Sequence, residues 1–525
     1  MKVIDAAKLQ QMIIGAFKYL EENKTVVDEL NVFPVPDGDT GTNMTMTMKS
    51  GVDKVNQSGL SNVEEVSKAL SQGTLMGARG NSGVILSQLV RGMSKTLKNK
   101  SEIKLEDIRD IFIAANKQAY RAVMQPTEGT ILTVARKMAE KAESDYEEGL
   151  DIDDYLITIV AEGQKALDNT PNQLPVLKEA GVVDSGGQGL LFLLRGALNA
   201  LNGEIERDVD LSSNDVANKE GMFLLKFELA TKESSYEKLK ESIGNLSEEF
   251  NSDFKDDLMV AELKTEHPHQ ILSVLLVDGV ILKVELENLN PNIEISVNEE
   301  KPAKKYGFIA VSRGEGYDEI LKSMNIDRII SGGQTMNPST EDIYKNIEEI
   351  NAENIIIFPN NKNIIMSSKQ ACELTDKNAF VVETRSIPES FTAMLEFDDS
   401  ESPKTNIENM NEVIADMHIV EVSISIRDTS VNNIEIKKDD YIGILDGKIV
   451  ASTSEIEQTA RLAVAKSCES DDISLITVYY GEDVDRKRAK DFVKKLSKEY
   501  KDVDVELVYG GQPIYYYQIT LEWCS

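Results

Sequence analysis

The first 205 residues repeat apolar side chains at steps of three and four, which is the spacing of one face of an α-helix. Leu9, Ile13 and Leu20 begin the pattern. Similar runs follow at residues 63–70, 84–97, 108–124, 130–142, 153–167 and 189–201. Strand-like alternation is almost absent from this part of the chain. The pattern therefore predicts an all-α domain of about eight helices over residues 1–205, with glycine-rich loops between them.

The pattern changes after this helical part. Residues 202–219 are polar and acidic, which predicts a linker. Residues 222–229 and 258–263 have the composition of strands, and a helical pattern lies between them at residues 235–250. These segments predict a small α/β middle module over residues 220–300.

From residue 301 onward, short apolar segments alternate with helical patterns. The predicted strands are residues 306–311, 354–358, 379–382, 417–425, 441–446 and 474–480. Alternation at this spacing is typical of βαβ units, so we expect a C-terminal α/β region. The acidic stretch 398–411 predicts a second linker, which would divide residues 301–525 into two lobes of about 301–398 and 412–525.

Composition narrows the class of protein. The chain has 525 residues, enough for three or four domains at roughly 150 residues each. Its 57 basic and 90 acidic side chains give a net charge of −33, which disfavours nucleic acid and anionic membranes as partners. Cys372, Cys468 and Cys524 are scattered and suggest a reduced environment. With neither a signal-peptide pattern nor a run of ~18 apolar residues, we expect a cytoplasmic protein without an integral membrane segment.

The segment at residues 31–43, NVFPVPDGDTGTN, concentrates polar groups in one short turn. Asp37 and Asp39 are two residues apart, so both carboxylates can face one side and hold a hard divalent cation. Thr40 to Asn43 then supply hydroxyls, an amide and a predicted helix N-terminus, which favours an anion. Taken alone, the segment is equally compatible with an ordinary surface turn.

A second polar segment, GARGNSG at residues 77–83, runs directly into an apolar helix. Its glycines would let backbone N–H groups approach a phosphate, and Asn81 and Ser82 are candidates to cap the helix. Arg79 would add a charged contact. The alternative is a close helix–helix contact that requires small residues, and on this segment alone that alternative is slightly favoured.

Two further predicted helix starts also combine polar side chains with glycine. Residues 181–189 place Asp184 among glycines before a helix, and residues 127–130 end in Thr130. Four such loops in one helical domain favour a shared metal-nucleotide site. The chain has no GxxxxGK[ST] motif and no HRD or DFG set, which excludes a P-loop enzyme and a protein kinase.

Residues 31–43, 77–83 and 184–189 resemble the nucleotide-binding domain of the dihydroxyacetone kinase L type, also called DAK2 or DhaL-like. That domain is an eight-helix barrel that holds ATP with two Mg²⁺ ions. Residues 331–342, 359–366 and 509–513 resemble the C-terminal part of the bacterial fatty acid kinase catalytic subunit. The resemblance spans nearly the whole chain. It implies an ATP-dependent kinase that phosphorylates a fatty acid held by a separate DegV-type binding protein, giving an acyl phosphate for phospholipid synthesis, and it implies a homodimer.

The resemblance also assigns residues. Asp37 and Asp39 match the family's Mg²⁺ ligands, and Asn31 stands near a further aspartate of the simpler dihydroxyacetone kinases. The residues expected to bind the nucleotide are Thr40, Gly41, Thr42, Asn43, Gly80, Asn81, Ser82, Gly83, Thr130 and Asp184. A fatty carboxylate is already ionised at neutral pH, so positioning and charge neutralisation would carry the rate without a strong general base.

The middle module departs from the family. Relatives commonly carry a Cys and a His-x-His there, which bind a structural zinc. The matching positions hold Lys226, Glu262 and Lys264, which do not form a plausible zinc site. We therefore expect no zinc, with ionic contacts between Glu262 and the lysines in its place. His267 and His269 are interpreted as turn residues and His418 as a core or strand residue.

In the third region, Asn337, Asn360, Asn361 and Lys362 fall in loops at strand ends, where α/β sheets present binding surfaces. The resemblance assigns this region to docking of the lipid-bearing partner. The alternative, that these residues simply close turns, has equal weight. Two other functions stay open: a kinase with another acceptor such as a small ketose, and a non-enzymatic nucleotide-sensing scaffold.

Overall fold

The computed structural model describes residues 3–32, 38–56, 60–123, 125–203, 223–244, 246–255, 257–265, 271, 274–275, 280–288, 304–333, 337–425, 428–431, 434–467 and 473–523. The chain divides into two compact units. The first combines Met1–Ile205 with Pro302–Ser525, and the second is Glu206–Lys301. Within the described ranges, no helix combines the length and apolarity that crossing a membrane would require.

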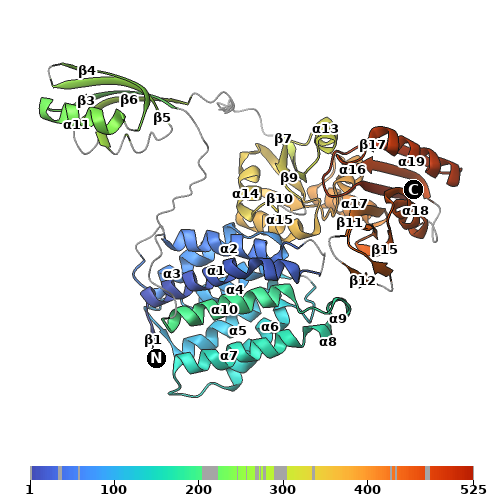
Figure 1. The fold of residues 1–525 in the computed structure, drawn as a ribbon, viewed down its shortest axis with the longest axis horizontal. Coiled ribbons are helices and arrows are strands. Elements are labelled where there is room, and N and C mark those ends of the chain that lie inside the picture. The colour runs from blue at the N-terminus through green and yellow to red at the C-terminus, as the bar shows by residue number, and fades with distance from the viewer. Residues whose placement is uncertain are drawn as a thin grey trace. The chain divides into compact units, whose positions relative to one another are not determined.

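The N-terminal part of the first unit is helical, as predicted (Figure 1). Its helices are α1 (Ala6–Glu29), α2 (Thr40–Asn56), α3 (Val63–Met76), α4 (Gly80–Thr96), α5 (Leu105–Ala122), α6 (Ile131–Ser144), α7 (Ile152–Asp168), α8 (Thr170–Gln173), α9 (Pro175–Ala180) and α10 (Ser185–Leu201). The short strands β1 (Val3–Ile4) and β2 (Ile103–Lys104) pair antiparallel. Each helix from α1 to α7 contacts the next, α7 contacts α10, and α10 contacts α1.

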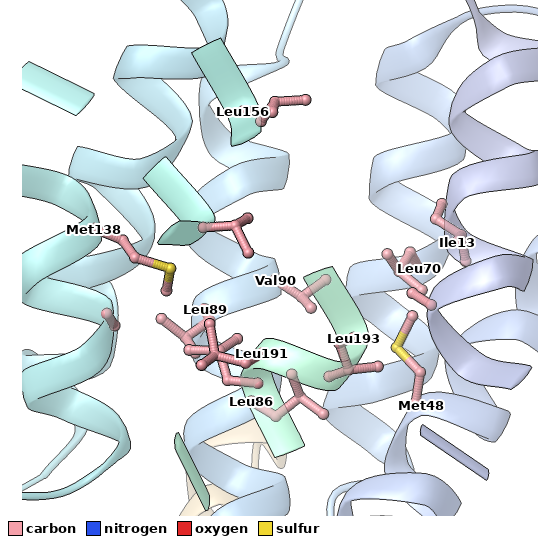
Figure 2. Close-up of a cluster of buried hydrophobic side chains, with 14 of the residues drawn as sticks. Ile13, Met48, Leu70, Leu86, Leu89, Val90, Met138, Leu156, Leu191 and Leu193 are labelled. Carbon is pink, nitrogen blue, oxygen red and sulfur yellow. The ribbon is translucent and has the colours of Figure 1, made fainter. Parts of the chain in front are cut away.

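The apolar faces of these helices meet in a common core. Figure 2 shows Leu86 and Leu89 of α4 next to Leu191 of α10, with Met138 of α6 nearby. The core surrounds an apolar cavity of about 210 Å³ whose lining comes from α1 to α7 and α10. The three- and four-residue spacing in the sequence therefore predicted the residues that form this core.

The C-terminal part of the first unit starts with a parallel sheet in the order β10-β9-β7-β8. Its strands are β7 (Lys304–Ser312), β8 (Arg328–Ser331), β9 (Ala352–Phe358) and β10 (Asn378–Val381). The helices that follow them are α13 (Glu315–Ser323), α14 (Thr340–Glu349), α15 (Lys362–Leu374) and α16 (Ile387–Leu395). The predicted strand and helix alternation is confirmed here.

The predicted linker at residues 398–411 is wrong, because most of it belongs to helix α17 (Pro403–Ala415). Ser402 caps this helix through the N–H of Thr405, and Pro403 occupies its first position. Met410 and Ile414 are buried. This helix has few apolar residues, and they stand among acidic and amide side chains. The helical spacing was therefore not recognised in the sequence.

The last part of the chain forms a six-stranded sheet in the order β15-β14-β11-β18-β16-β17. Its strands are β11 (His418–Ile424), β14 (Tyr441–Leu445), β15 (Lys448–Thr453), β16 (Ile473–Tyr480), β17 (Asp504–Tyr509) and β18 (Tyr517–Trp523). Helices α18 (Ile456–Ser467) and α19 (Arg486–Glu499) pack against this sheet, and β12 (Thr429–Val431) pairs with β13 (Ile434–Ile436). His418 lies in β11, as interpreted, and pairs with Asp446.

In the described residues of the second unit, helix α11 accompanies an antiparallel sheet in the order β4-β5-β3-β6. Its elements are β3 (Phe223–Ala230), α11 (Glu233–Gly244), β4 (Glu248–Lys255), β5 (Leu258–Thr265) and β6 (Val280–Asn288). The helix predicted for residues 235–250 is too long, because its last residues belong to β4. His267 and His269 lie outside the described residues.

Lys226 and Glu262 face each other on the paired strands β3 and β5. The Nζ atom of Lys226 lies 3.1 Å from an Oε atom of Glu262, and both side chains are about half exposed. The predicted ionic contact is therefore confirmed for this pair. An exposed pair of this kind contributes little stability, between about 0 and 1 kcal/mol.

Leu191→Ala should lower the free energy of unfolding by about 3 kcal/mol, because the substitution empties part of a closely packed core. Leu191 is completely buried. Leu395→Ala is the matched control, since Leu395 is 76% exposed, and it should change stability by less than about 0.5 kcal/mol. Urea unfolding of the full chain measures both variants. Equal losses would contradict the assignment of Leu191 to the core.

We predict that the protein, purified without chelators, contains well below one equivalent of zinc. The positions that would hold the metal are occupied by Lys226, Glu262 and Lys264, and a lysine ammonium is not a zinc ligand at neutral pH. Inductively coupled plasma mass spectrometry of the purified chain measures its zinc content. One tightly bound equivalent in the middle module would contradict the prediction.

Candidate functional site

The polar turn at residues 31–43 ends directly at a helix N-terminus. Helix α2 begins at Thr40, as predicted, and the Asn43 N–H donates to the Asp39 carbonyl at 2.8 Å. Asp39 is only 9% exposed, and it lines a pocket together with the buried residues Asn31 and Asn43. Asp37 lies outside the described residues. A buried carboxylate at a helix N-terminus is an unusual position for a simple surface turn.

Gly41 and Thr42, predicted as nucleotide contacts, have structural partners on helix α1. A Cβ atom on Gly41 would lie 2.2 Å from the Lys24 carbonyl oxygen, so only glycine allows α2 to start this close to α1. The Thr42 hydroxyl and N–H both donate to the Asp28 carboxylate, at 2.9 and 3.0 Å. Neither residue lines the pocket. Their contact with a nucleotide stays a prediction.

The GARGNSG loop leads into helix α4, which begins at Gly80. The expected caps are wrong, because Arg79 holds the N-cap position and makes no side-chain cap bond. Gly80 has a φ of +61°, and a Cβ atom on Gly83 would lie 2.3 Å from the Thr47 hydroxyl. The close-packing alternative is thus confirmed for Gly83. Asn81 and Ser82 line the pocket instead of capping the helix.

Thr130 and Asp184 cap the two other helices at this end of the helical part. Thr130 accepts from the Leu132 N–H at the start of α6, and Asp184 accepts from the Gly187 N–H at 2.7 Å at the start of α10. The following Ser185 hydroxyl lies 3.3 Å from the Thr40 hydroxyl. Burial raises the pKa of Asp184 to about 6, although the N–H groups of Gly187 and Ile131 lower it in part.

One pocket of about 230 Å³ collects residues from all four loops. The predicted site residues that line it are Asn31, Asp39, Thr40, Asn43, Asn81, Ser82, Thr130 and Asp184. Apolar side chains complete its wall, among them Ile85, Val123, Ile131 and Leu132. Gly80 does not line it, and neither do the close-packing glycines. The structure therefore brings together most of the side chains that the sequence pattern singled out.

The C-terminal α/β part also reaches this pocket, which the sequence reasoning missed. Asn363 and Met366 of helix α15 lie in its wall. The Asn81 amide donates to Asn363 Oδ1 at 3.3 Å, and the Asn337 amide donates to Asp39 Oδ2 at 2.7 Å. A cluster of amides in short loops was the only sequence signal, and local spacing does not tell which distant loop such amides contact.

The side chains of Asn360 and Asn361 make hydrogen bonds within the C-terminal part. Asn361 caps α15 through the N–H of Asn363 at 2.8 Å. Asn360 adopts a left-handed conformation with a φ of +56°, and its amide donates to the Val311 carbonyl. The turn-closing alternative is confirmed for these two residues. Asn337 differs, because its side chain crosses to the helical part.

The pocket has the donor set of a hard cation rather than of zinc. Among the described residues, no group of three or more His, Cys, Asp or Glu side chains is placed to hold a metal. The pocket instead offers the Asp39 carboxylate with several amide and hydroxyl oxygens, which are the ligands of Mg²⁺. Asn81 lines the pocket and its Oδ1 atom is buried without a protein partner, so one acceptor remains there for a ligand. These residues fit a divalent cation bound together with a polyphosphate.

Asp184→Asn should change how stability depends on pH. In the unfolded chain the carboxyl titrates near 3.9, whereas burial raises its pKa to about 6 in the folded protein. Wild-type stability should therefore fall relative to the variant as pH rises from about 4 to 6, by on the order of 2 kcal/mol in total. Asparagine keeps an oxygen for the Gly187 N–H.

Urea unfolding at pH 4 and pH 6 compares the wild type with Asp184→Asn. Asp184→Ala serves as the second comparison, since it removes the cap as well as the charge and should be less stable than the asparagine variant by about 1 kcal/mol. Identical pH dependence in the wild type and Asp184→Asn would show that the Asp184 carboxylate is not desolvated.

Comparison with known proteins follows the division of the first unit. Residues 34–199 match the DAK2 domain, and residues 307–522 match the C-terminal family of FakA-like fatty acid kinase chains. Protein YloV of Bacillus subtilis (strain 168) is 37% identical over 551 residues, covering 99% of this chain and 100% of that protein. Uncharacterized protein SAR1202 of Staphylococcus aureus (strain MRSA252) is 37% identical over 545 residues, covering 99% of each chain.

Solved structures give weaker likenesses. The dihydroxyacetone kinase of C. freundii has a TM-score of 0.32 at 10% identity, covering 42% of this chain and 48% of that chain. The Fak B3 protein of Streptococcus pneumoniae has a TM-score of 0.29 at 11% identity, covering 42% of this chain and 99% of that chain. The full-length relatives and the two family matches show that this chain belongs to the FakA-like fatty acid kinase family, with a DAK2 domain ahead of the family's C-terminal region.

Proposed function

We propose that the protein is a cytoplasmic ATP- and Mg²⁺-dependent kinase that phosphorylates the carboxylate of a fatty acid held by a separate DegV-type binding protein. The helical part would be the dihydroxyacetone kinase L-like barrel that binds the nucleotide. The product would be an acyl phosphate, which is an activated precursor for phospholipid synthesis. A homodimer remains part of the proposal.

The observation that carries this proposal is the convergence of four polar loops on one pocket. Asp39 and Asn31 supply oxygens for a cation, and the start of helix α4 supplies polar side chains. The positive ends of the α2 and α4 dipoles favour an anion near them. The apolar wall, including Ile85 and Val123, suits a purine base. A metal-bound nucleotide accounts for all four features together.

The proposed step forms one bond and breaks one bond. An oxygen of the fatty carboxylate attacks the γ-phosphorus, the bond from that phosphorus to the β-phosphate bridging oxygen breaks, and ADP leaves. The carboxylate is ionised at neutral pH, so no proton has to be removed. A bound Mg²⁺ would neutralise charge on the phosphates. Asp39 and Asp37 would hold that ion, and the amides and hydroxyls of the pocket would orient the nucleotide.

The family description and the size of the pocket both support a separate fatty-acid carrier as the partner. The family description names this type of chain as one subunit of a fatty acid kinase, which implies at least one further subunit. The pocket near Asp39 has a volume of about 230 Å³, which a metal-bound nucleotide alone would fill, leaving no room there for a fatty acyl chain. A separate carrier that presents only the carboxylate would meet this constraint. The residues that dock the carrier stay a prediction within residues 301–525.

Incubation with [γ-³²P]ATP and Mg²⁺ tests the function directly. The chain is incubated alone, with dihydroxyacetone, with an empty DegV-type protein, and with the same protein loaded with oleic acid. We expect labelled acyl phosphate only in the last reaction. Label transferred to dihydroxyacetone instead would support a ketose kinase, and no transfer to any acceptor would support a nucleotide-sensing scaffold.

Asp39→Ala should reduce phosphoryl transfer by at least about 100-fold, because it removes the proposed metal ligand. Asp53→Ala, on the helix that follows Asp39, is the matched control, since Asp53 is exposed, and it should leave the rate within about twofold. Circular dichroism verifies that both variants are folded. Transfer at the wild-type rate by folded Asp39→Ala would refute the assignment of the metal site.

A further inference from the structure

We infer that Asn337 is a positioning residue for the nucleotide site, through which the C-terminal α/β part holds the Asp39 carboxylate in its binding orientation. The inference rests on the proposed function, because it assumes that Asp39 serves a metal-bound nucleotide. It adds a residue from the other half of the chain, 298 positions away along the sequence.

The contact is short and enclosed. The Asn337 Nδ2 atom donates to Asp39 Oδ2 at 2.7 Å and lies 3.5 Å from Asn43 Oδ1. Asn337 is 3% exposed and Asp39 is 9% exposed, so water does not compete freely for this bond. A hydrogen bond to a charged group is shorter and stronger than one between neutral groups. One carboxylate oxygen of Asp39 is thus fixed, and the orientation of the other oxygen is fixed with it.

Asn337 is itself held firmly by the helical part. The Arg79 Nη1 atom donates to the Asn337 carbonyl at 2.7 Å, and Arg79 Nη2 lies 3.6 Å from a carboxylate oxygen of Asp342. The Thr340 N–H donates to the Ala78 carbonyl at 3.1 Å. Because Thr340 is the first residue of helix α14, these bonds join the start of α14 to the loop before α4. Asn337 is therefore a rigid donor rather than a mobile side chain.

The amide is also the side chain that suits this place chemically. It donates to Asp39 without adding a second negative charge beside it, whereas an aspartate at position 337 would repel Asp39. Its Oδ1 atom is buried and has no protein partner. An unsatisfied buried acceptor destabilises the fold, and such a group is often found at a functional site.

Other contacts between the two parts provide a control. Gln370 of α15 donates to the Leu75 carbonyl at 2.7 Å and lies 3.3 Å from Gln88. These bonds join the same two parts, and neither Gln370 nor Asn337 is among the residues that line the pocket; Asn337 differs because its amide donates to Asp39. A variant of Gln370 weakens the junction in general. A variant of Asn337 removes the contact with Asp39 in particular.

The experiment measures nucleotide binding by titration calorimetry on the full-length chain, with the non-hydrolysable analogue AMP-PNP in the presence and absence of Mg²⁺. Asn337→Ala should weaken binding about tenfold with Mg²⁺ and change it less than about threefold without Mg²⁺. Gln370→Ala should stay within about threefold under both conditions. Equal losses in the two variants, or an unchanged Mg²⁺-dependent affinity in Asn337→Ala, would overturn the inference.

Two further variants separate the possible failures. If Asp39→Ala leaves Mg²⁺-dependent binding unchanged, the proposed metal site is wrong, and the role of Asn337 fails with it. If Asp39→Ala weakens binding and folded Asn337→Ala does not, only the role of Asn337 fails. Asn337→Asp covers the case in which the alanine variant does not fold. This variant places a second carboxylate beside Asp39, and a bound cation would relieve the repulsion between the two. Mg²⁺ should therefore raise the melting temperature of Asn337→Asp more than that of the wild type, and an equal rise would contradict the inference.

Discussion

The buried Asp39 carboxylate is the group on which the arrangement of the first unit depends. A charge that is 9% exposed needs hydrogen-bond donors or a cation, because its desolvation is otherwise costly. The helical part alone places it at the start of α2. The C-terminal part supplies the Asn337 amide at 2.7 Å. The two halves of the first unit therefore meet at a shared polar site.

The sequence predicted the parts of the fold that depend on periodic apolar residues. The helical part, the core residues such as Leu191 and the alternation after residue 301 all follow from local spacing. Helix α17 and strand β4 were missed where charged residues or a preceding helical pattern dominated. Local patterns also identified most pocket residues, because polar side chains at helix starts converge when the helices pack side by side.

The sequence did not reveal which distant residues complete the pocket. Asn337 and Asn363 occur in loops that are equally typical of turns, and nothing local distinguishes them from Asn361, which does cap a helix. The sequence also did not reveal which glycines are required by packing. Gly41 and Gly83 are required by close contacts with Lys24 and Thr47, so a glycine-rich loop can satisfy packing and border a ligand pocket at once. Such distinctions depend on tertiary contacts.

A crystal structure of the full-length chain with Mg²⁺ and AMP-PNP tests the central claim most directly. We expect a metal-bound triphosphate in the pocket between the α2 and α4 N-termini, with Asp39 on the metal and the Asn337 amide still bonded to the Asp39 carboxylate. A nucleotide bound away from this pocket, or a metal without Asp39 among its ligands, would contradict the claim.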